Sequence, residues 1–417
     1  MKRLLPLLLL ASCSRAPDDP SVPQWSKEQI ASLKAWAQKA PQDALPLFDT
    51  SELDKLAGGW DKLATRRAAT VLAEQLATAH LRGCAPVADR QGWLIDDRLD
   101  SAGLRERLVA ALSSGENLDS FFGSVRPAHS QYAALQSAYM AETDPGRRLT
   151  LARNLERWRW MPQSLGEDYV LVDIPRFEVG LWRRGAHVQT WPAIVGKTST
   201  PTPVFAAQMQ SVTFNPWWFV PPSIIRSGGV GRRGYVWTKG GTVKQPPGPR
   251  NALGQVKIEM PNPYAIFLHD TPSRGLFSAP YRAYSHGCVR VGDAMGFAAT
   301  LLRDQYSRTQ VDWLAGIRNQ PRVSRPAPRP AAAGQEQASA DQYKTQSVAL
   351  PVKLPVYVAY FTAAARDDGT LAFSPDLYKL DAGISDPAGQ GKRCEIPDEA
   401  KLFAMRSNTG AKVSGAP

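Results

Sequence analysis

A cysteine and a histidine in this chain of 417 residues have the types and the spacing that nucleophilic catalysis needs. Cys288 lies in the run Ser285-His286-Gly287-Cys288-Val289-Arg290, and His269 lies upstream, at the end of the strand-like run Tyr264-Ala-Ile-Phe-Leu. A cysteine attacks as its thiolate, so it needs a base or a lowered pKa. A histidine can accept the thiol proton and later return it to a leaving amine. The two residues are therefore a candidate nucleophile and base for acyl transfer.

The residues beside Cys288 suit the same chemistry. Gly287 lets the backbone turn sharply, so that consecutive N–H groups can point at one oxyanion. Arg290 is suited to hold a substrate carboxylate. A buried structural thiol is another interpretation of Cys288.

A zinc site is a further alternative, with the candidate ligands His269, His286, Cys288 and Asp270. The chain shows no ligand set with the spacing of known zinc sites, so we expect no metal and no cofactor.

Helical patterns fill the N-terminal part of the chain. From Trp25 to about Leu112, apolar residues recur at intervals of three and four, and Ser26 with Gln29 could form a capping box. Helical patterns continue over 119–143 and 147–159, where Trp158 and Trp160 are expected to pack in the core. We predict a helical scaffold domain over residues 26–150.

The pattern changes to short strands near Tyr169. The run 169–175 is β-branched, the run 177–182 alternates, and Gly185 makes a hairpin into 187–195. Strand patterns continue to about residue 268, and 294–306 returns to a helix. The fold class predicted is therefore α+β, with a β-rich, sandwich-like or barrel-like catalytic domain over 151–320.

Several segments outside these strands have their own character. The Gly- and Pro-rich run 228–249 predicts a mobile loop, and Trp217 and Trp218 could line a groove or pack in the core. The composition of 322–339 predicts a disordered linker over 321–346.

The C-terminal part returns to strand patterns. Residues 352–361 alternate like a strand, which we expect at the edge of the β-rich domain, and 367–370 predict a hairpin turn. We assign 347–382 to C-terminal strands that join the catalytic domain, and 383–417 to a tail.

The N-terminus has the pattern of an export signal. Lys2 and Arg3 precede the apolar run 4–11. Leu10-Ala11-Ser12-Cys13 resembles a bacterial lipobox, which implies a signal peptide over 1–12, cleavage before Cys13 and lipid on that cysteine. A plain signal peptide is the alternative. By the lipobox rule, Ser14 favours the outer membrane, and 13–25 is a flexible tether.

Charge and cysteines add two further expectations. The net charge of +12 attracts polyanions. For an exported protein we expect anionic envelope polymers and lipid head groups as partners, and no nucleic acid.

Export would permit a disulfide between Cys84 and Cys394, but we expect two isolated thiols, because the sequence does not show that they come within bridging distance.

The run from His269 to Arg290 resembles the catalytic signature of L,D-transpeptidases with a YkuD-type domain. In that signature a histidine precedes Ser/Thr-His-Gly-Cys by an interval like the fifteen residues that separate His269 from Ser285 here. Further segments are similar to the long periplasmic members of the family: 154–162, 195–205, 215–222, 245–254, 268–272 and 355–378. The chain departs from those members before Asn154, where no room remains for their small wall-binding helical domain, and over 225–250, which is short for their lid-like insertion.

The resemblance implies a mechanism. Cys288 attacks a stem-peptide carbonyl to form a thioester, and His269 is the base, oriented by the backbone carbonyl of Asp270. The N–H groups of Gly287 and Cys288 hold the oxyanion. Ser285, His286 and Arg290 bind substrate or shape the loop.

The function implied is a peptidoglycan L,D-transpeptidase that makes 3→3 cross-links in the periplasm, lipid-anchored to the outer membrane. Its partners would be a tetrapeptide donor, a diamino-acid acceptor and the membrane. Two alternatives stay open. The same acyl-enzyme could act as a carboxypeptidase or endopeptidase, or could attach an envelope protein to the wall. The other alternative is a catalytically silent wall-binding scaffold.

Overall fold

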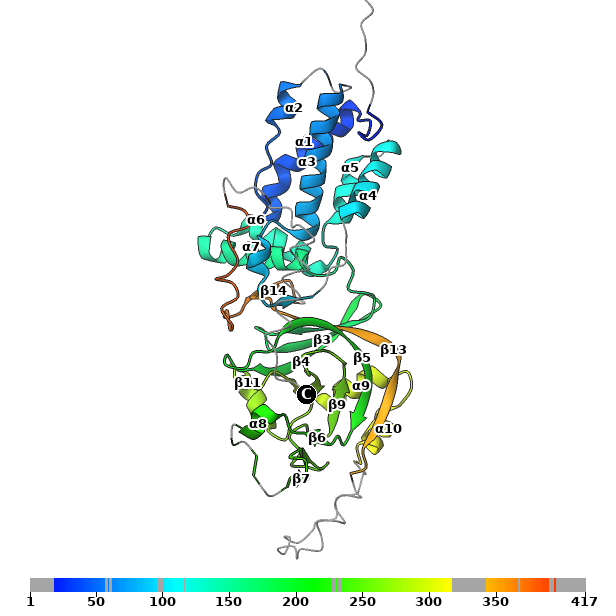
Figure 1. The fold of residues 1–417 in the computed structure, drawn as a ribbon, viewed down its shortest axis with the longest axis vertical. Coiled ribbons are helices and arrows are strands. Elements are labelled where there is room, and N and C mark those ends of the chain that lie inside the picture. Colours follow the sequence, from blue (N-terminus) through cyan, green and yellow to red (C-terminus); the bar gives the residue numbers. More distant parts are fainter. Residues whose placement is uncertain are drawn as a thin grey trace, which may run out of the picture.

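The protein, described here by a computed structural model, has a helical part and a β-rich part stacked along its long axis (Figure 1). The structure describes residues 19–389 apart from 57–58, 60–61, 96–100, 116, 227, 229, 232–233, 317–342 and 367, together with Cys394. The predicted signal peptide 1–12, Cys13, most of the linker 321–346 and most of the tail lie outside the described residues.

The helices are concentrated in the N-terminal part. They are α1 (Lys27–Lys39), α2 (Ser51–Lys55), α3 (Leu63–Arg82), α4 (Ser101–Ser113), α5 (Leu118–Val125), α6 (Ser130–Ala141), α7 (Pro145–Arg159), α8 (Pro222–Arg226), α9 (Ala294–Leu302) and α10 (Arg308–Leu314). The predicted capping box is confirmed, because Ser26 Oγ accepts the Gln29 N–H while the Gln29 side chain accepts the Ser26 N–H. Figure 1 shows α6 and α7 lying across the end of the helical part, next to the β-rich part.

The strands follow from Trp93 onward. They are β1 (Trp93–Leu94), β2 (Tyr169–Asp173), β3 (Glu178–Arg183), β4 (Ala186–Gly196), β5 (Val204–Phe214), β6 (Trp218–Phe219), β7 (Val236–Trp237), β8 (Val243–Gln245), β9 (Val256–Glu259), β10 (Leu268–His269), β11 (Ala283–Ser285), β12 (Val289–Val291), β13 (Gln346–Ala359), β14 (Ala363–Ala365) and β15 (Leu371–Phe373).

The main sheet closes on itself. Its order is β1-β5-β13-β2-β3-β4-β12-β10-β9, and β9 also pairs with β5, so the path from β5 to β9 forms a barrel. The apolar side chains of these strands fill the interior, where Val170, Val212 and Leu268 are fully buried. Because the sheet closes, the backbone N–H and C=O groups of its strand edges are paired with each other and are not open to other chains. The predicted α+β class with a barrel-like domain is confirmed.

β13 is not at the edge of the sheet, as the sequence analysis expected, but in its interior. It pairs antiparallel with β5 and parallel with β2. Val356 and Val358 are fully buried between these neighbours. The expectation was wrong because the two partner strands come from parts of the chain more than a hundred residues away, which strand periodicity cannot detect.

Two further segments differ from the sequence-based expectation. Trp93 and Leu94, inside the predicted helical run 25–112, form β1, which pairs with Val204 and Phe205 of β5. The predicted loop 228–249 contains β7 and β8, which form a small antiparallel sheet with β6. Both are strands of two or three residues, too short to produce a period in the sequence.

The expectation of two isolated thiols is wrong, because Cys84 and Cys394 form a disulfide with a Cα–Cα distance of 4.4 Å. Upstream of Cys394, Arg153 Nε donates to the Ile384 carbonyl and the Ser385 N–H donates to Asp89. Ile384, Ser385 and Cys394 therefore lie against the helical part, although the sequence of the tail has little hydrophobic pattern.

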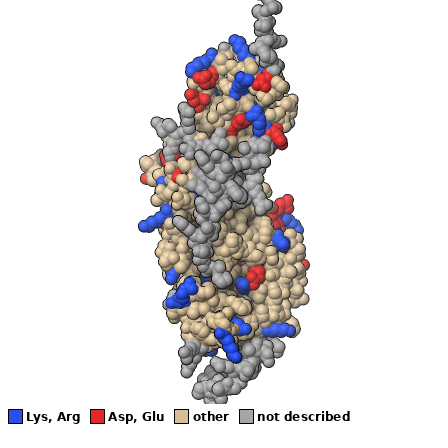
Figure 2. Space-filling view, in the orientation of Figure 1, with Lys and Arg blue, Asp and Glu red and all other residues tan. Residues whose placement is uncertain are grey.

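The predicted core positions of Trp158 and Trp160 are confirmed, since both are buried. Basic side chains are spread over the visible face of the β-rich part in Figure 2, without forming one large patch. Across the described ranges, no helix combines the length and the apolar character needed to cross a bilayer.

Candidate active site

Two short parallel strands bring His269 and Cys288 to the same face of the barrel. In the pairing of β10 with β12, Leu268 lies opposite Val289 and His269 lies opposite Arg290. Leu268 and Val289 point into the core, so His269 and Arg290 point to the other face. Cys288 directly precedes β12 and, in the same register, lies opposite Phe267, so it is diagonal to His269 across the two strands. The histidine and the cysteine are therefore neighbours on this face.

His269 is held as a neutral imidazole in a defined orientation. The ring is buried, and its Nδ1 lies 2.5 Å from the Asp270 carbonyl oxygen. Because a carbonyl only accepts, Nδ1 is the donor, and Nε2 is left as the basic nitrogen. Burial and then the positive charge of Arg290 lower the pKa of His269 to about 3.

The carboxylate of Asp270 has other partners. It accepts the Gln255 N–H at 2.9 Å and pairs with Arg274 Nη2 at 3.1 Å. As the sequence analysis expected, the histidine is thus oriented by a backbone carbonyl and not by a carboxylate.

The Cys288 thiol is also neutral at rest. Burial raises its pKa to about 11, against a hydrogen bond with the Phe267 backbone and the charges of Lys257 and Arg290, which lower it. Its Sγ lies 3.8 Å from the Ala265 carbonyl oxygen, to which it donates. His269 and Cys288 are both in the described part of the chain, and no hydrogen bond joins them. The free protein therefore does not hold a thiolate–imidazolium pair.

The Gly287 N–H, which the sequence analysis expected to hold the oxyanion, already has a hydrogen-bond partner. The Gly287 N–H donates to Ser285 Oγ at 3.0 Å, and Ser285 Oγ donates to the Cys288 carbonyl oxygen at 2.6 Å. The Gly287 N–H is thus not free in this structure, because a serine hydroxyl can accept from the backbone two residues on. The Cys288 N–H has no hydrogen-bond partner among the described residues.

Gly287 is required by both conformation and space. Its φ is +117°, which side chains rarely adopt, and a Cβ there would lie 3.1 Å from Ile266 Cδ1.

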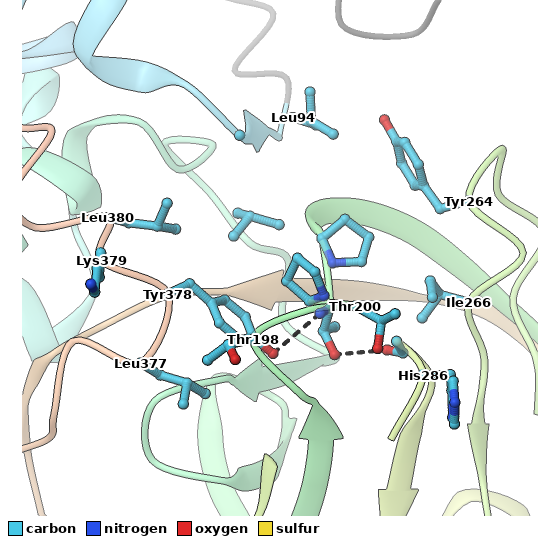
Figure 3. A pocket seen from close by; sticks show the side chains of 16 residues that line it. Leu94, Thr198, Thr200, Tyr264, Ile266, His286, Leu377, Tyr378, Lys379 and Leu380 are labelled. Carbon is cyan, nitrogen blue, oxygen red and sulfur yellow. Dashed lines mark hydrogen bonds between the residues drawn. The ribbon is translucent and has the colours of Figure 1, made fainter. Parts of the chain in front are cut away.

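A threonine and a tyrosine fix the other side of this loop. Thr202 Oγ1 donates to the Gly287 carbonyl oxygen at 2.7 Å and accepts the Gly196 N–H at 2.9 Å. The Tyr378 hydroxyl donates to the Gly196 carbonyl oxygen at 2.6 Å and accepts the Thr202 N–H at 3.2 Å. Two segments distant in sequence, residues 196–202 and Tyr378, thus position the loop before Cys288 (Figure 3). Sequence reasoning missed both roles; the only signal was that each lies in a segment similar to the family.

A pocket of about 620 Å³ borders this loop. Gly287 and His286 form one wall, and Leu94, Tyr264 and Leu377 contribute from other segments (Figure 3). His286 therefore faces this pocket, whereas Ser285 is buried within the loop. Burial, then Lys197 and Arg290, lowers the pKa of His286. The loop thus has a mostly apolar cavity beside it that a substrate group could enter.

The ligands proposed for a zinc site do not form a metal-binding cluster. Within the described ranges, no group of three or more His, Cys, Asp or Glu side chains is arranged to hold a metal ion.

Comparison with known proteins identifies the β-rich part. Residues 167–313 match the YkuD family, described as the L,D-transpeptidase catalytic domain. A Haemophilus influenzae protein provisionally named as an L,D-transpeptidase is 27% identical over 312 residues, which are 67% of this chain and 58% of that relative. The chain therefore spans less than two thirds of the relative's length.

Solved structures are also similar. An L,D-transpeptidase from Mycobacterium smegmatis has 19% identity and a TM-score of 0.23, covering 34% of this chain and 55% of its own. A C442S mutant of the Enterococcus faecium L,D-transpeptidase has 13% identity and a TM-score of 0.23, covering 57% and 96%. The assignment rests on the sequence match and not on these low scores. Residues 167–313, which include His269 and Cys288, therefore match the YkuD family of L,D-transpeptidase catalytic domains.

Proposed function

We propose that the protein is a peptidoglycan L,D-transpeptidase that forms 3→3 cross-links through a thioester on Cys288. The observation that carries this proposal is the parallel pairing of β10 with β12, which sets His269 beside Cys288 within a domain of this family. The proposed substrates are a tetrapeptide stem as donor and a second stem as acceptor.

In the first half-reaction, Cys288 Sγ attacks the carbonyl carbon between stem positions three and four. Nε2 of His269 takes the thiol proton, and the Cys288 N–H receives the negative charge of the oxyanion. The carbon–nitrogen bond to D-Ala then breaks, and His269 returns the proton to the leaving amine. The product is a thioester on Cys288.

In the second half-reaction, the side-chain amine of another stem attacks the thioester carbonyl. His269 accepts a proton from this amine and gives it to the departing sulfur. The new bond is an amide between two diamino acids, and the thiol of Cys288 is restored.

Because the Cys288 thiol and the His269 imidazole are both neutral at rest, proton transfer between them depends on the bound substrate. Because burial favours the uncharged forms of both Cys288 and His269, proton transfer between them is unfavourable before a substrate is bound. A carbonyl placed beside Sγ lets proton transfer and bond formation proceed together. Arg290, partly buried next to both groups, supplies positive charge on the side where sulfur becomes negative.

Incubation of the purified protein with tetrapeptide muropeptides, followed by liquid chromatography and mass spectrometry, tests the proposal. Dimers that appear with loss of D-Ala are the expected result. Trimmed monomers without dimers would instead indicate carboxypeptidase or endopeptidase action. Unchanged muropeptides, with wall binding retained, would indicate a silent scaffold.

The N-terminal motif supports a second part of the proposal, a lipid on Cys13 that anchors an exported protein to the outer membrane. Residues 26–150 would then be a scaffold between this anchor and the catalytic domain. Metabolic labelling with a fatty-acid analogue is expected to depend on Cys13. Equal labelling of the Cys13→Ala variant would exclude the anchor.

A further inference from the structure

The small sheet of β6, β8 and β7 presents exposed aromatic side chains. Phe219, Lys244 and Val236 lie opposite one another across its three strands, and Trp217 lies two residues before Phe219. Phe219 is 66% exposed and Trp217 is 36% exposed. The Lys244 Nζ lies 4.7 Å from the centre of the Trp217 ring. We call Trp217, Phe219 and Lys244 the aromatic shelf.

The opposite face of the small sheet is buried at its central strand, β8, whereas Trp237 on β7 is 49% exposed. Val243 and Gln245, the neighbours of Lys244 on β8, are both buried. The central strand β8 therefore uses one face for packing, and the shelf is on the face that is left in solvent. Single exposed aromatic residues are common on protein surfaces, but rings grouped with a cation on a sheet of their own point to a binding surface.

The aromatic shelf forms one side of a groove of about 310 Å³. The other side comes from the main sheet, where Lys257 and Glu259 of β9 line it. These two side chains form an ion pair, with 3.0 Å between Nζ and Oε2. The groove thus combines two aromatic rings with one carboxylate and two ammonium groups.

Strand register connects this groove to the catalytic pair. Lys257 lies opposite His269 on β10 and opposite Thr213 on β5. The neighbours Val256 and Ile258 point into the core, so Lys257 lies on the face that holds His269. One strand spacing, about 4.8 Å, separates Lys257 from His269. Lys257 therefore both lines the groove and lies on the strand next to His269.

The mixture of groups in the groove fits a saccharide. Sugar rings present C–H bonds on their faces, which pack on aromatic rings, and hydroxyl and amide groups at their edges, which bond to carboxylates and ammonium groups. A bilayer surface would fit less well, because Glu259 would meet anionic head groups and would be costly to bury in acyl chains.

We propose that this groove binds the glycan strand that carries the stem peptide. The inference rests on the proposed function for its substrate, but it concerns a separate surface. Stacking on Trp217 and Phe219 would hold the sugars while the attached peptide extends past Lys257 toward Cys288.

Binding of peptide-free oligomers of N-acetylglucosamine, measured by isothermal titration calorimetry, tests the groove without any turnover. Phe219→Ala and Trp217→Ala are each expected to weaken binding about tenfold, which corresponds to ~1.4 kcal/mol. Phe373→Ala is the matched control, since Phe373 is 38% exposed on β15, outside the groove. Its affinity should equal that of the wild type.

Two outcomes would overturn the inference. One is undetectable binding, or equal affinity of the wild type and both shelf variants. The other is binding to anionic phospholipid vesicles, lost in Phe219→Ala, with no binding of the oligomers, which would make the shelf a membrane contact.

Kinetics separate this inference from the proposed function. The ratio of kcat/KM for a disaccharide-linked tetrapeptide to that for the free tetrapeptide is expected to fall about tenfold in Phe219→Ala. An unchanged ratio would count against the groove. If the wild type turned over neither substrate, the proposed function would fail, and the oligomer titration would still decide whether the groove binds glycan.

Discussion

The hydroxyl of Thr202 donates a hydrogen bond to the carbonyl oxygen of Gly287, with 2.7 Å between the two oxygens. Thr202 is buried, and its Oγ1 also accepts the Gly196 N–H. This one side chain therefore connects the end of β4 to the residue before Cys288.

Thr202→Val is expected to slow catalysis more than it destabilises the fold. Valine keeps the shape but leaves the Gly287 carbonyl and the Gly196 N–H without a partner, at a cost of about 1–3 kcal/mol. If about 1.4 kcal/mol of that cost is lost from the stabilisation of the transition state, kcat/KM for D-Ala release falls about tenfold. Thr309→Val, at an exposed threonine of α10 away from the pocket, serves as the control. Equal rates in the two variants would show that Thr202 does not position the loop.

Cys288→Ala should abolish D-Ala release while the protein stays folded. Removal of the sulfur removes the nucleophile, and the buried volume lost is small. Thermal unfolding followed by circular dichroism should give a Tm within a few degrees of the wild type. Residual release above a few per cent of the wild-type rate would exclude the cysteine mechanism.

Alkylation of Cys288 in the free protein should be slow and should increase with pH without a plateau up to about pH 10. The pKa of its thiol is raised to about 11, so the reactive thiolate fraction grows tenfold for each pH unit below that value. Iodoacetamide labelling of a Cys13→Ser chain, quantified by intact mass, measures this rate. A plateau below pH 8 would instead indicate a thiolate stabilised by a protonated His269.

The same raised pKa has a consequence for stability. Between the ordinary pKa of a thiol and about pH 11, the unfolded chain releases the Cys288 proton while the folded chain retains it. The free energy of unfolding contributed by this residue therefore falls as pH rises through that window. Cys288→Ala should remove this part of the alkaline decline, which urea titrations at several pH values would detect.

Reduction should destabilise the protein through the Cys84–Cys394 disulfide. The bond joins residues 310 apart in sequence, and opening a native disulfide typically costs about 2–4 kcal/mol. Dithiothreitol is expected to lower the Tm of the wild type but not that of the Cys84→Ser/Cys394→Ser variant. An equal response of both proteins would show that the bond contributes no stability.

The sequence alone was enough to predict features that depend on neighbouring residues. The capping box of Ser26 and Gln29 and the strand at 169–173 depend on contacts within a few residues, so their patterns are visible in the chain. The motif around Cys288 and its interval from His269 could also be recognised in the sequence, because the chemistry restricts which residues can occupy those positions.

Only the tertiary structure decided which distant groups become partners. The interior place of β13, the Cys84–Cys394 disulfide and the bonds of Thr202 and Tyr378 join segments separated by tens to hundreds of residues. The engagement of the Gly287 N–H by Ser285 is local, but it depends on a loop conformation that those distant contacts hold. Such contacts form only when the whole barrel closes, since their energy comes from packing and not from the preference of any single segment.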